Sequence, residues 1–108
     1  MSPKKNLILL ALNEINFDIV LSYTKLFPRR FPAFEALLSG FRLHTQSEKN
    51  YNELEPWIQW ASIHTGLSYE EHKIFRLGDV VGSPFPQIFE HLESSGLKVG
   101  CVSPMNAE

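Results

Sequence analysis

The chain has 108 residues, of which 44% are hydrophobic, 12% aromatic and 20% charged, and its formal net charge is -2 at pH 7. This composition is that of one small globular domain rather than a disordered, fibrous or disulfide-built chain. The slight acidity gives no reason to expect nucleic acid or an anionic membrane surface as a partner. The single cysteine, Cys101, excludes an internal disulfide and fits a reducing compartment, so a cytoplasmic location is expected.

An apolar run over residues 7–12 (LILLAL) follows MSPKK at the N-terminus. The run is too short for a membrane helix, and no small-residue cleavage site of a signal peptide follows it. A continuous apolar run is typical of a parallel strand that is covered on both faces. The sequence therefore predicts a buried first strand here and no membrane-spanning segment.

Two helical pieces and a second strand are predicted next. The first helical piece has an apolar side, and Asn16 or Asp18 could cap its N-terminus. The second piece begins at Pro32 and stops at Gly40, the residue types that favour the start and the end of a helix. Residues 41–49 then alternate between apolar and polar, which indicates a strand nearer the edge of a sheet.

The stretch EPWIQWASIHTG over residues 55–66 predicts a helix, with Glu55 at the cap position and Pro56 at the first helical position. Four side chains at helical spacing are expected to form one buried face: Trp57, Trp60, Ala61 and His64. The carboxylate of Glu55 is either a simple cap or part of an anion or metal site, because the positive end of the helix dipole points outward there.

The last third of the chain completes the predicted order of elements. Residues 68–86 are rich in Gly and Pro and are expected to be mostly loop. An amphipathic helix follows, opened by Ser83 and Pro84 and closed at Gly96, and residues 97–104 are expected to form a third strand. Strand, helix, strand, helix, helix, strand predicts an α/β fold, a three-layer sandwich with a mostly parallel sheet.

Three stretches, LILLALNE, EPWIQWASIHTG and EEHKIF, resemble the alkaline phosphatase-like superfamily in their order and spacing. That superfamily includes sulfatases, nucleotide phosphodiesterases and phosphopentomutases. The most specific part of the resemblance is Thr65 and Gly66 followed by His72. It implies hydrolysis of a small-molecule phosphate or sulfate ester with a bound divalent metal: zinc, manganese, magnesium or calcium. It also implies that residues 1–108 are the truncated N-terminal part of one alkaline phosphatase-like α/β domain, with the remainder of the catalytic domain missing.

The resemblance also assigns candidate site residues. Asn13 takes the place of the family's first-strand aspartate, with Glu14 beside it, and both are expected to be metal ligands. Pro56 falls where the family has its nucleophile and cannot act as one. A shift of one residue brings Glu55 to that place as the candidate catalytic carboxylate. Asn13, Glu14 and Glu55 are expected to face one centre beyond the carboxyl ends of the strands.

Two further residues leave alternatives open. Arg76 is a candidate anion-binding residue, although an ion pair with Asp79 explains it equally well. His72 either assists a metal or a phosphoryl oxygen, or it is a structural residue of the turn, as in the family. The sequence lacks a Gly-x-Ser-x-Gly elbow, a phosphate loop, a dinucleotide motif and a Cys-x-x-Cys pair. Two hypotheses follow: a divergent hydrolase that is inactive as this fragment alone, or a non-catalytic α/β binding or scaffolding domain.

Overall fold

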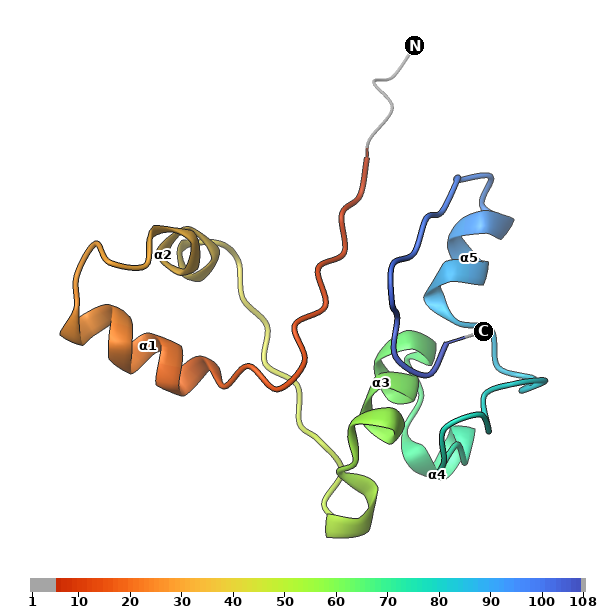
Figure 1. Cartoon of the computed structure of the whole chain (residues 1–108). Helices are drawn as coiled ribbons and strands as arrows, with labels where there is room; N and C mark the ends of the chain where they lie inside the picture. The colour runs from red at the N-terminus through yellow and green to blue at the C-terminus, as the bar shows by residue number, and fades with distance from the viewer. Residues whose placement is uncertain (1–5, 108) are drawn as a thin grey trace. The chain divides into compact units, whose positions relative to one another are not determined.

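The computed structural model describes residues 6–107. The chain divides into two compact units, Met1–Thr45 and Gln46–Glu108. Figure 1 shows helices joined by turns and extended segments, and the described residues contain no β-strand. The predicted three-layer α/β sandwich with a mostly parallel sheet is therefore wrong. None of the helices formed by residues 6–107 is long and apolar enough to cross a membrane.

The first unit contains helices α1 (Phe17–Leu26) and α2 (Pro32–Ser39), which contact each other. Asn16 caps α1, because its side-chain oxygen accepts hydrogen bonds from the backbone N–H groups of Asp18 (2.9 Å) and Ile19 (3.2 Å). Of the two caps that the sequence allowed, Asn16 is the one observed, and Asp18 lies in the first turn. Satisfying N–H groups that have no partner inside the helix fixes the first turn.

Helix α2 begins at Pro32, and Gly40 is the C-cap that follows its last residue, as predicted. Proline suits a first turn because its missing N–H is not needed there and its φ angle is already helical. The carboxylate of Glu35 accepts a hydrogen bond from the backbone N–H of Arg29 (2.9 Å), which ties α2 to the turn before it. Within residues 6–45 no side chain is buried, so this helical pair lacks a core of its own.

The second unit begins with a short 3₁₀ helix, η1 (Tyr51–Glu53). Three α-helices follow: α3 (Pro56–Thr65), α4 (Tyr69–His72) and α5 (Ile88–Ser94). Helix α3 contacts both α4 and α5. Its buried stripe consists of Ile58, Ala61 and His64. Together with Ile74 and Val80 from the following loop, the two apolar residues of this stripe make the buried core.

The predicted aromatic face of α3 is only partly correct. Ala61 and His64 are buried as expected, whereas Trp57 and Trp60 are half-buried. Ile58, which the predicted face left out, is fully buried. The buried stripe is therefore rotated toward Ile58, and Ala61 packs in one cluster with Ile74 and Val80 of the loop after α4.

Asn106 joins three parts of the second unit. Its side-chain nitrogen donates to the backbone oxygen of Trp57 (2.8 Å), and its side-chain oxygen accepts from the backbone N–H of Gly78 (3.3 Å). Its own backbone oxygen accepts from the side-chain nitrogen of Gln87 (3.3 Å). Because Asn106 and Gln87 are both buried, these bonds satisfy groups that would otherwise be costly to remove from water.

None of the three predicted strands forms in the described part of the chain. Residues 7–12, 41–49 and 97–104 form no ladder with one another in the part of the chain that the structure describes. Phe41 is 91% exposed and Val102 is 95% exposed, so side chains expected in a core face water. The apolar and alternating patterns favour strands, but a strand also needs a hydrogen-bonded neighbour, and these residues find none within residues 6–107. Val102 and Ser103 lie instead in a bend, with a left-handed φ angle of 49° at Ser103.

Candidate functional site

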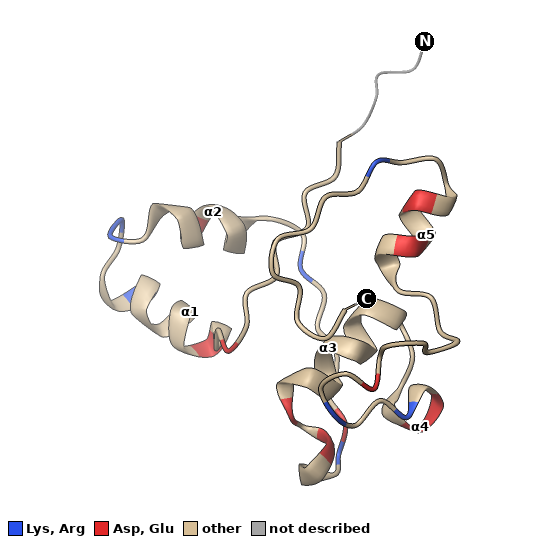
Figure 2. Ribbon diagram, turned by 45° about the vertical axis from the view of Figure 1, so that its right-hand side comes forward, with Lys and Arg blue, Asp and Glu red and all other residues tan. Residues whose placement is uncertain are grey.

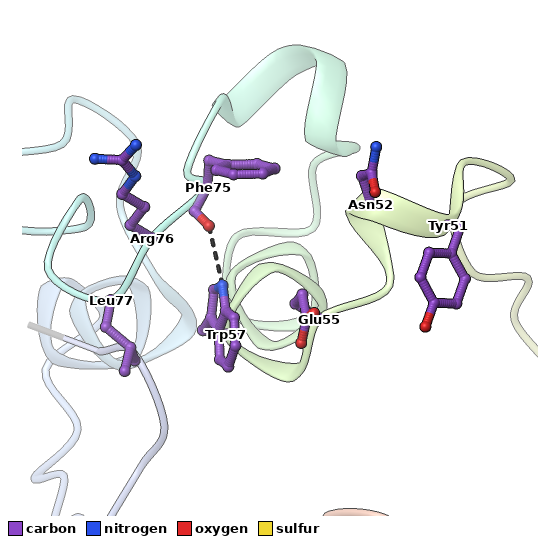
Figure 3. A pocket seen from close by; sticks show the side chains of 7 residues that line it. All are labelled: Tyr51, Asn52, Glu55, Trp57, Phe75, Arg76 and Leu77. Atoms are coloured by element: carbon purple, nitrogen blue, oxygen red, sulfur yellow. Dashed lines mark hydrogen bonds between the residues drawn. The ribbon is translucent and has the colours of Figure 1, made fainter.

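An open hollow of about 440 Å³ lies in the second unit, beside the N-terminus of α3. Figure 3 shows its lining, which comes from η1, the first turn of α3 and the loop after α4. The residues that line it are Tyr51, Asn52, Glu55, Trp57, Phe75, Arg76 and Leu77. The hollow therefore combines aromatic faces with one carboxylate and one guanidinium.

A hydrogen bond orients the indole of Trp57 at the hollow. The indole Nε1–H of Trp57 donates to the backbone oxygen of Phe75 (3.0 Å), as the dashed line in Figure 3 shows. The bond joins α3 to the loop after α4, across 18 positions of sequence. A half-buried indole with its N–H bonded has a set orientation, so the Trp57 side of the hollow is formed before any ligand arrives.

Glu55 occupies the cap position of α3 through its backbone alone. Its φ and ψ angles are extended (-63° and 139°), and its backbone oxygen accepts from Ile58 (2.9 Å) and Gln59 (3.0 Å). Its carboxylate makes no capping hydrogen bond and is exposed at the hollow. The side-chain geometry of Glu55 therefore does not support the first of the two alternatives, in which its carboxylate is a simple cap.

Arg76 reaches the other edge of the hollow. The carboxylate of Asp79 accepts hydrogen bonds from the backbone N–H groups of Phe75 (3.2 Å) and Arg76 (2.8 Å), rather than pairing with the guanidinium. The Arg76 side chain is exposed. In Figure 3 its guanidinium points away from Glu55, and the Trp57 side chain lies between the two. The hollow thus has separate acidic and basic edges.

The predicted metal ligands Asn13 and Glu14 belong to the first unit, whereas Glu55 belongs to the second. Glu14 lies in a turn before α1 with a left-handed φ angle of 58°. The expected convergence of Asn13, Glu14 and Glu55 on one centre stays a prediction. Its basis in strand ends no longer holds, because residues 7–12 form no strand of a sheet.

Residues 6–107 contain no group of three or more His, Cys, Asp or Glu side chains placed to hold a metal ion. The hollow supplies one exposed carboxylate, from Glu55, and one side-chain amide, from Asn52. Divalent ions of the expected kinds take four to eight ligands. These two groups alone do not fit such an ion.

Thr65 and Gly66 end α3 by local hydrogen bonding. The Thr65 hydroxyl donates to the backbone oxygen of Ala61 (2.7 Å) and accepts from the backbone N–H of Leu67 (3.3 Å). Gly66 has φ 73° and ψ 14°, the left-handed conformation of a helix C-cap, and its N–H donates to the backbone oxygen of Ser62 (2.8 Å). The Thr-Gly pair therefore stops the helix and turns the chain toward α4.

His72 is held in one tautomer by two contacts. The backbone N–H of Ile74 donates to His72 Nδ1 (2.9 Å), so this nitrogen is an acceptor and carries no proton in the neutral ring. The ring proton is then on Nε2, which donates to the Ser62 hydroxyl oxygen (2.9 Å). Sequence reasoning missed Ser62, since no motif marks a serine ten positions before a histidine.

This tautomer rules out general-base activation of Ser62 in the neutral ring, because the nitrogen facing the hydroxyl already bears the proton. Burial lowers the pKa of His72, and the carboxylates of Glu48 and Glu71 oppose that shift more weakly. Protonating Nδ1 would also break its hydrogen bond with Ile74, because the new N–H of the ring and the backbone N–H of Ile74 are both donors. His72 therefore acts in this geometry as a structural residue that joins α3 to the turn after α4.

No protein-family model, curated protein or solved structure matches the chain.

Proposed function

We propose that the chain acts as a non-catalytic binding domain whose hollow takes a small-molecule phosphate or sulfate ester with an aromatic group. The observation that carries the proposal is the oriented indole of Trp57, which lines the hollow together with Phe75 and the exposed Arg76. Aromatic side chains suit the ring of such an ester. The guanidinium offers paired donors that match the oxygens of phosphate and sulfate.

Binding without turnover follows from the groups near the hollow. Pro56 occupies the position next to Glu55 and offers neither a nucleophile nor a proton. The Ser62 hydroxyl faces the protonated nitrogen of His72, so that pair does not supply an activated nucleophile. The carboxylate of Glu55 repels a bound oxyanion, which favours a pose with the ester group at Arg76 and the ring at Trp57.

A second candidate function is a share in the site of a metal-dependent phosphate or sulfate ester hydrolase. One observation favours it: the Glu55 carboxylate is not used to cap α3 and faces the hollow. In this candidate the other metal ligands come from outside the 108 residues. The two candidates differ in whether a divalent ion and Glu55 strengthen ester binding or weaken it.

Binding is tested by titrating phenyl phosphate and phenyl sulfate while following tryptophan fluorescence. Phenol and inorganic phosphate, the two parts of phenyl phosphate, are titrated for comparison. We expect the intact esters to bind more tightly than either part. Arg76→Ala should weaken ester binding about fivefold, the equivalent of about 1 kcal/mol, and leave phenol binding unchanged. Lys73→Ala is the matched control, because Lys73 is also an exposed cation but does not line the hollow. Equal effects of the two substitutions would contradict the proposal.

Turnover is tested on the same preparation with zinc, manganese, magnesium or calcium added. We expect no hydrolysis of p-nitrophenyl phosphate, bis-p-nitrophenyl phosphate or p-nitrophenyl sulfate. Under the binding proposal, Glu55→Gln removes a repulsion and ester affinity stays equal or rises. Hydrolysis that copurifies with the chain and disappears in Glu55→Gln would establish the hydrolase candidate instead.

A further inference from the structure

Residues 7–12, the apolar segment, belong to the first unit, are exposed and follow an extended course in Figure 1. Ile8 is 90% exposed, Leu7 69% and Leu9 59%. No hydrogen bond within residues 6–107 involves the backbone of this segment. An extended backbone with free N–H and C=O groups and apolar side chains is the feature by which strands from different chains pair.

Charge favours pairing of this segment with itself. Residues 6–13 carry no charge, and Figure 2 shows no acidic or basic colour along the described part of this stretch. In the sequence, Lys4 and Lys5 precede the segment and Glu14 follows it. Antiparallel pairing of two copies brings the basic end of one to the acidic end of the other, whereas parallel pairing places like charges together.

We propose that the apolar segment forms an intermolecular antiparallel β-ladder with the same segment of other copies of this chain. Pairing about a two-fold axis makes the contact self-complementary, because each copy offers the same residues to the other. The net charge of -2 per chain is small, so whole-molecule repulsion between copies is weak.

Buried area decides how far this association extends. A fully buried Leu or Ile removes about 90 Å² of apolar surface from water, so the five large side chains of the segment give a pair of copies at most about 900 Å². Stable interfaces bury about 1,200 Å² or more, and a two-stranded ribbon alone is marginal. A pair also leaves both outer edges unpaired. Further copies therefore add strands, and association continues beyond the dimer.

The test is sedimentation velocity on the full chain from about 5 µM to about 500 µM. We expect the mean mass to rise with concentration past the dimer and to fall again on dilution. Deuterium exchange at the highest concentration should show protection of residues 7–12 that is absent at the lowest. A mean mass equal to the monomer at every concentration overturns the proposal.

Three variants distinguish a β-ladder from non-specific hydrophobic association. Leu9→Lys adds a charge to the segment and should abolish association. Leu9→Pro keeps an apolar side chain but removes a ladder donor, and it should abolish association as well. Ile63→Lys is the matched control, because Ile63 lies on α3 and is also 59% exposed. It should associate like the wild type.

Each outcome of the variants has one meaning. Loss of association in both Leu9 variants and its retention in Ile63→Lys supports the ladder. Association of Leu9→Pro like the wild type overturns it, and so does equal loss in Leu9→Lys and Ile63→Lys. Neither Leu9 nor Ile63 is buried, so circular dichroism should show unchanged helix content in all three variants.

Discussion

His64 is a buried side chain with an unsatisfied atom. It is 4% exposed, and its Nδ1 has no hydrogen-bond partner in the described part of the chain. Its ring contacts Trp60 on the same helix (5.6 Å between centroids) and Phe89 on α5 (5.1 Å). Burial in this aromatic setting lowers the pKa of His64, because the charged ring loses its hydration.

The lowered pKa of His64 predicts that acid destabilises the second unit. A histidine whose pKa is lower in the folded state binds its proton more tightly when the chain is unfolded. Its contribution to stability is therefore complete above the ordinary pKa of about 6.5 and is lost as the pH falls below that value. The pKa of His72 is lowered too, so the two residues act in the same direction. Urea unfolding at pH about 8 and about 5 measures the combined loss.

A substitution isolates the share of His64. His64→Phe keeps an aromatic ring between Trp60 and Phe89 and removes the unsatisfied nitrogen. We expect its stability to fall less than that of the wild type between pH about 8 and about 5. The comparison at the higher pH serves as the control, since both rings are uncharged there. An identical pH dependence in the two proteins would assign the acid effect to His72 and to other groups.

At the scale of one element, the end of α3 depends on the backbone of Gly66. A Cβ added at Gly66 would meet nothing within 4 Å, so a side chain there is not excluded by contact. The cost of Gly66→Ala is instead conformational, because the φ angle of 73° is unfavourable for any residue with a Cβ.

We therefore expect Gly66→Ala to lower the free energy of unfolding by about 1 kcal/mol. Gly100→Ala is a suitable control, since Gly100 also has open space around it and does not have a left-handed φ angle. That control should change stability by less than about 0.5 kcal/mol. Urea unfolding followed by circular dichroism measures both. Equal effects of the two substitutions would show that the left-handed cap does not stabilise α3.

The helices were predictable because their determinants lie within a few residues. Asn16 caps α1, Pro32 opens α2, and α3 runs from Pro56 to Thr65 as its sequence indicates. The start of α5 was placed too early, at Ser83, whereas the helix begins at Ile88 behind a cap at Gln87. The predicted loop before it also contains the short helix α4.

The strands failed for a different reason, since pairing depends on residues distant in sequence. A run such as residues 7–12 specifies extended backbone but does not specify a partner. The candidate site shows the same division. Glu55 and Arg76 were singled out from local patterns and line one hollow. The bond from Trp57 to Phe75 and the contact between Ser62 and His72 link α3 to later residues, and no local pattern encodes either one.

At the scale of the whole molecule, the two units differ in how much they bury. The buried apolar residues Ile58, Ala61, Ile74 and Val80 all belong to the second unit. Within residues 6–45 the helices are capped and contact each other, yet none of their side chains is buried. Since helices of eight to ten residues gain most of their stability from packing, the first unit should open far more readily than the second.

Amide hydrogen exchange measures this difference directly. At low concentration, where copies do not associate, we expect the amides of α3 to exchange at least about tenfold more slowly than those of α1 relative to unfolded rates. Both helices have ten residues, so length does not explain such a gap. Ala61→Gly should remove much of the protection of α3, because it deletes a fully buried methyl group and weakens the helix. The matched change Ala36→Gly on the exposed side of α2 should leave α3 unaffected. Equal protection of α1 and α3 would mean that burial within the second unit does not govern the stability of this chain.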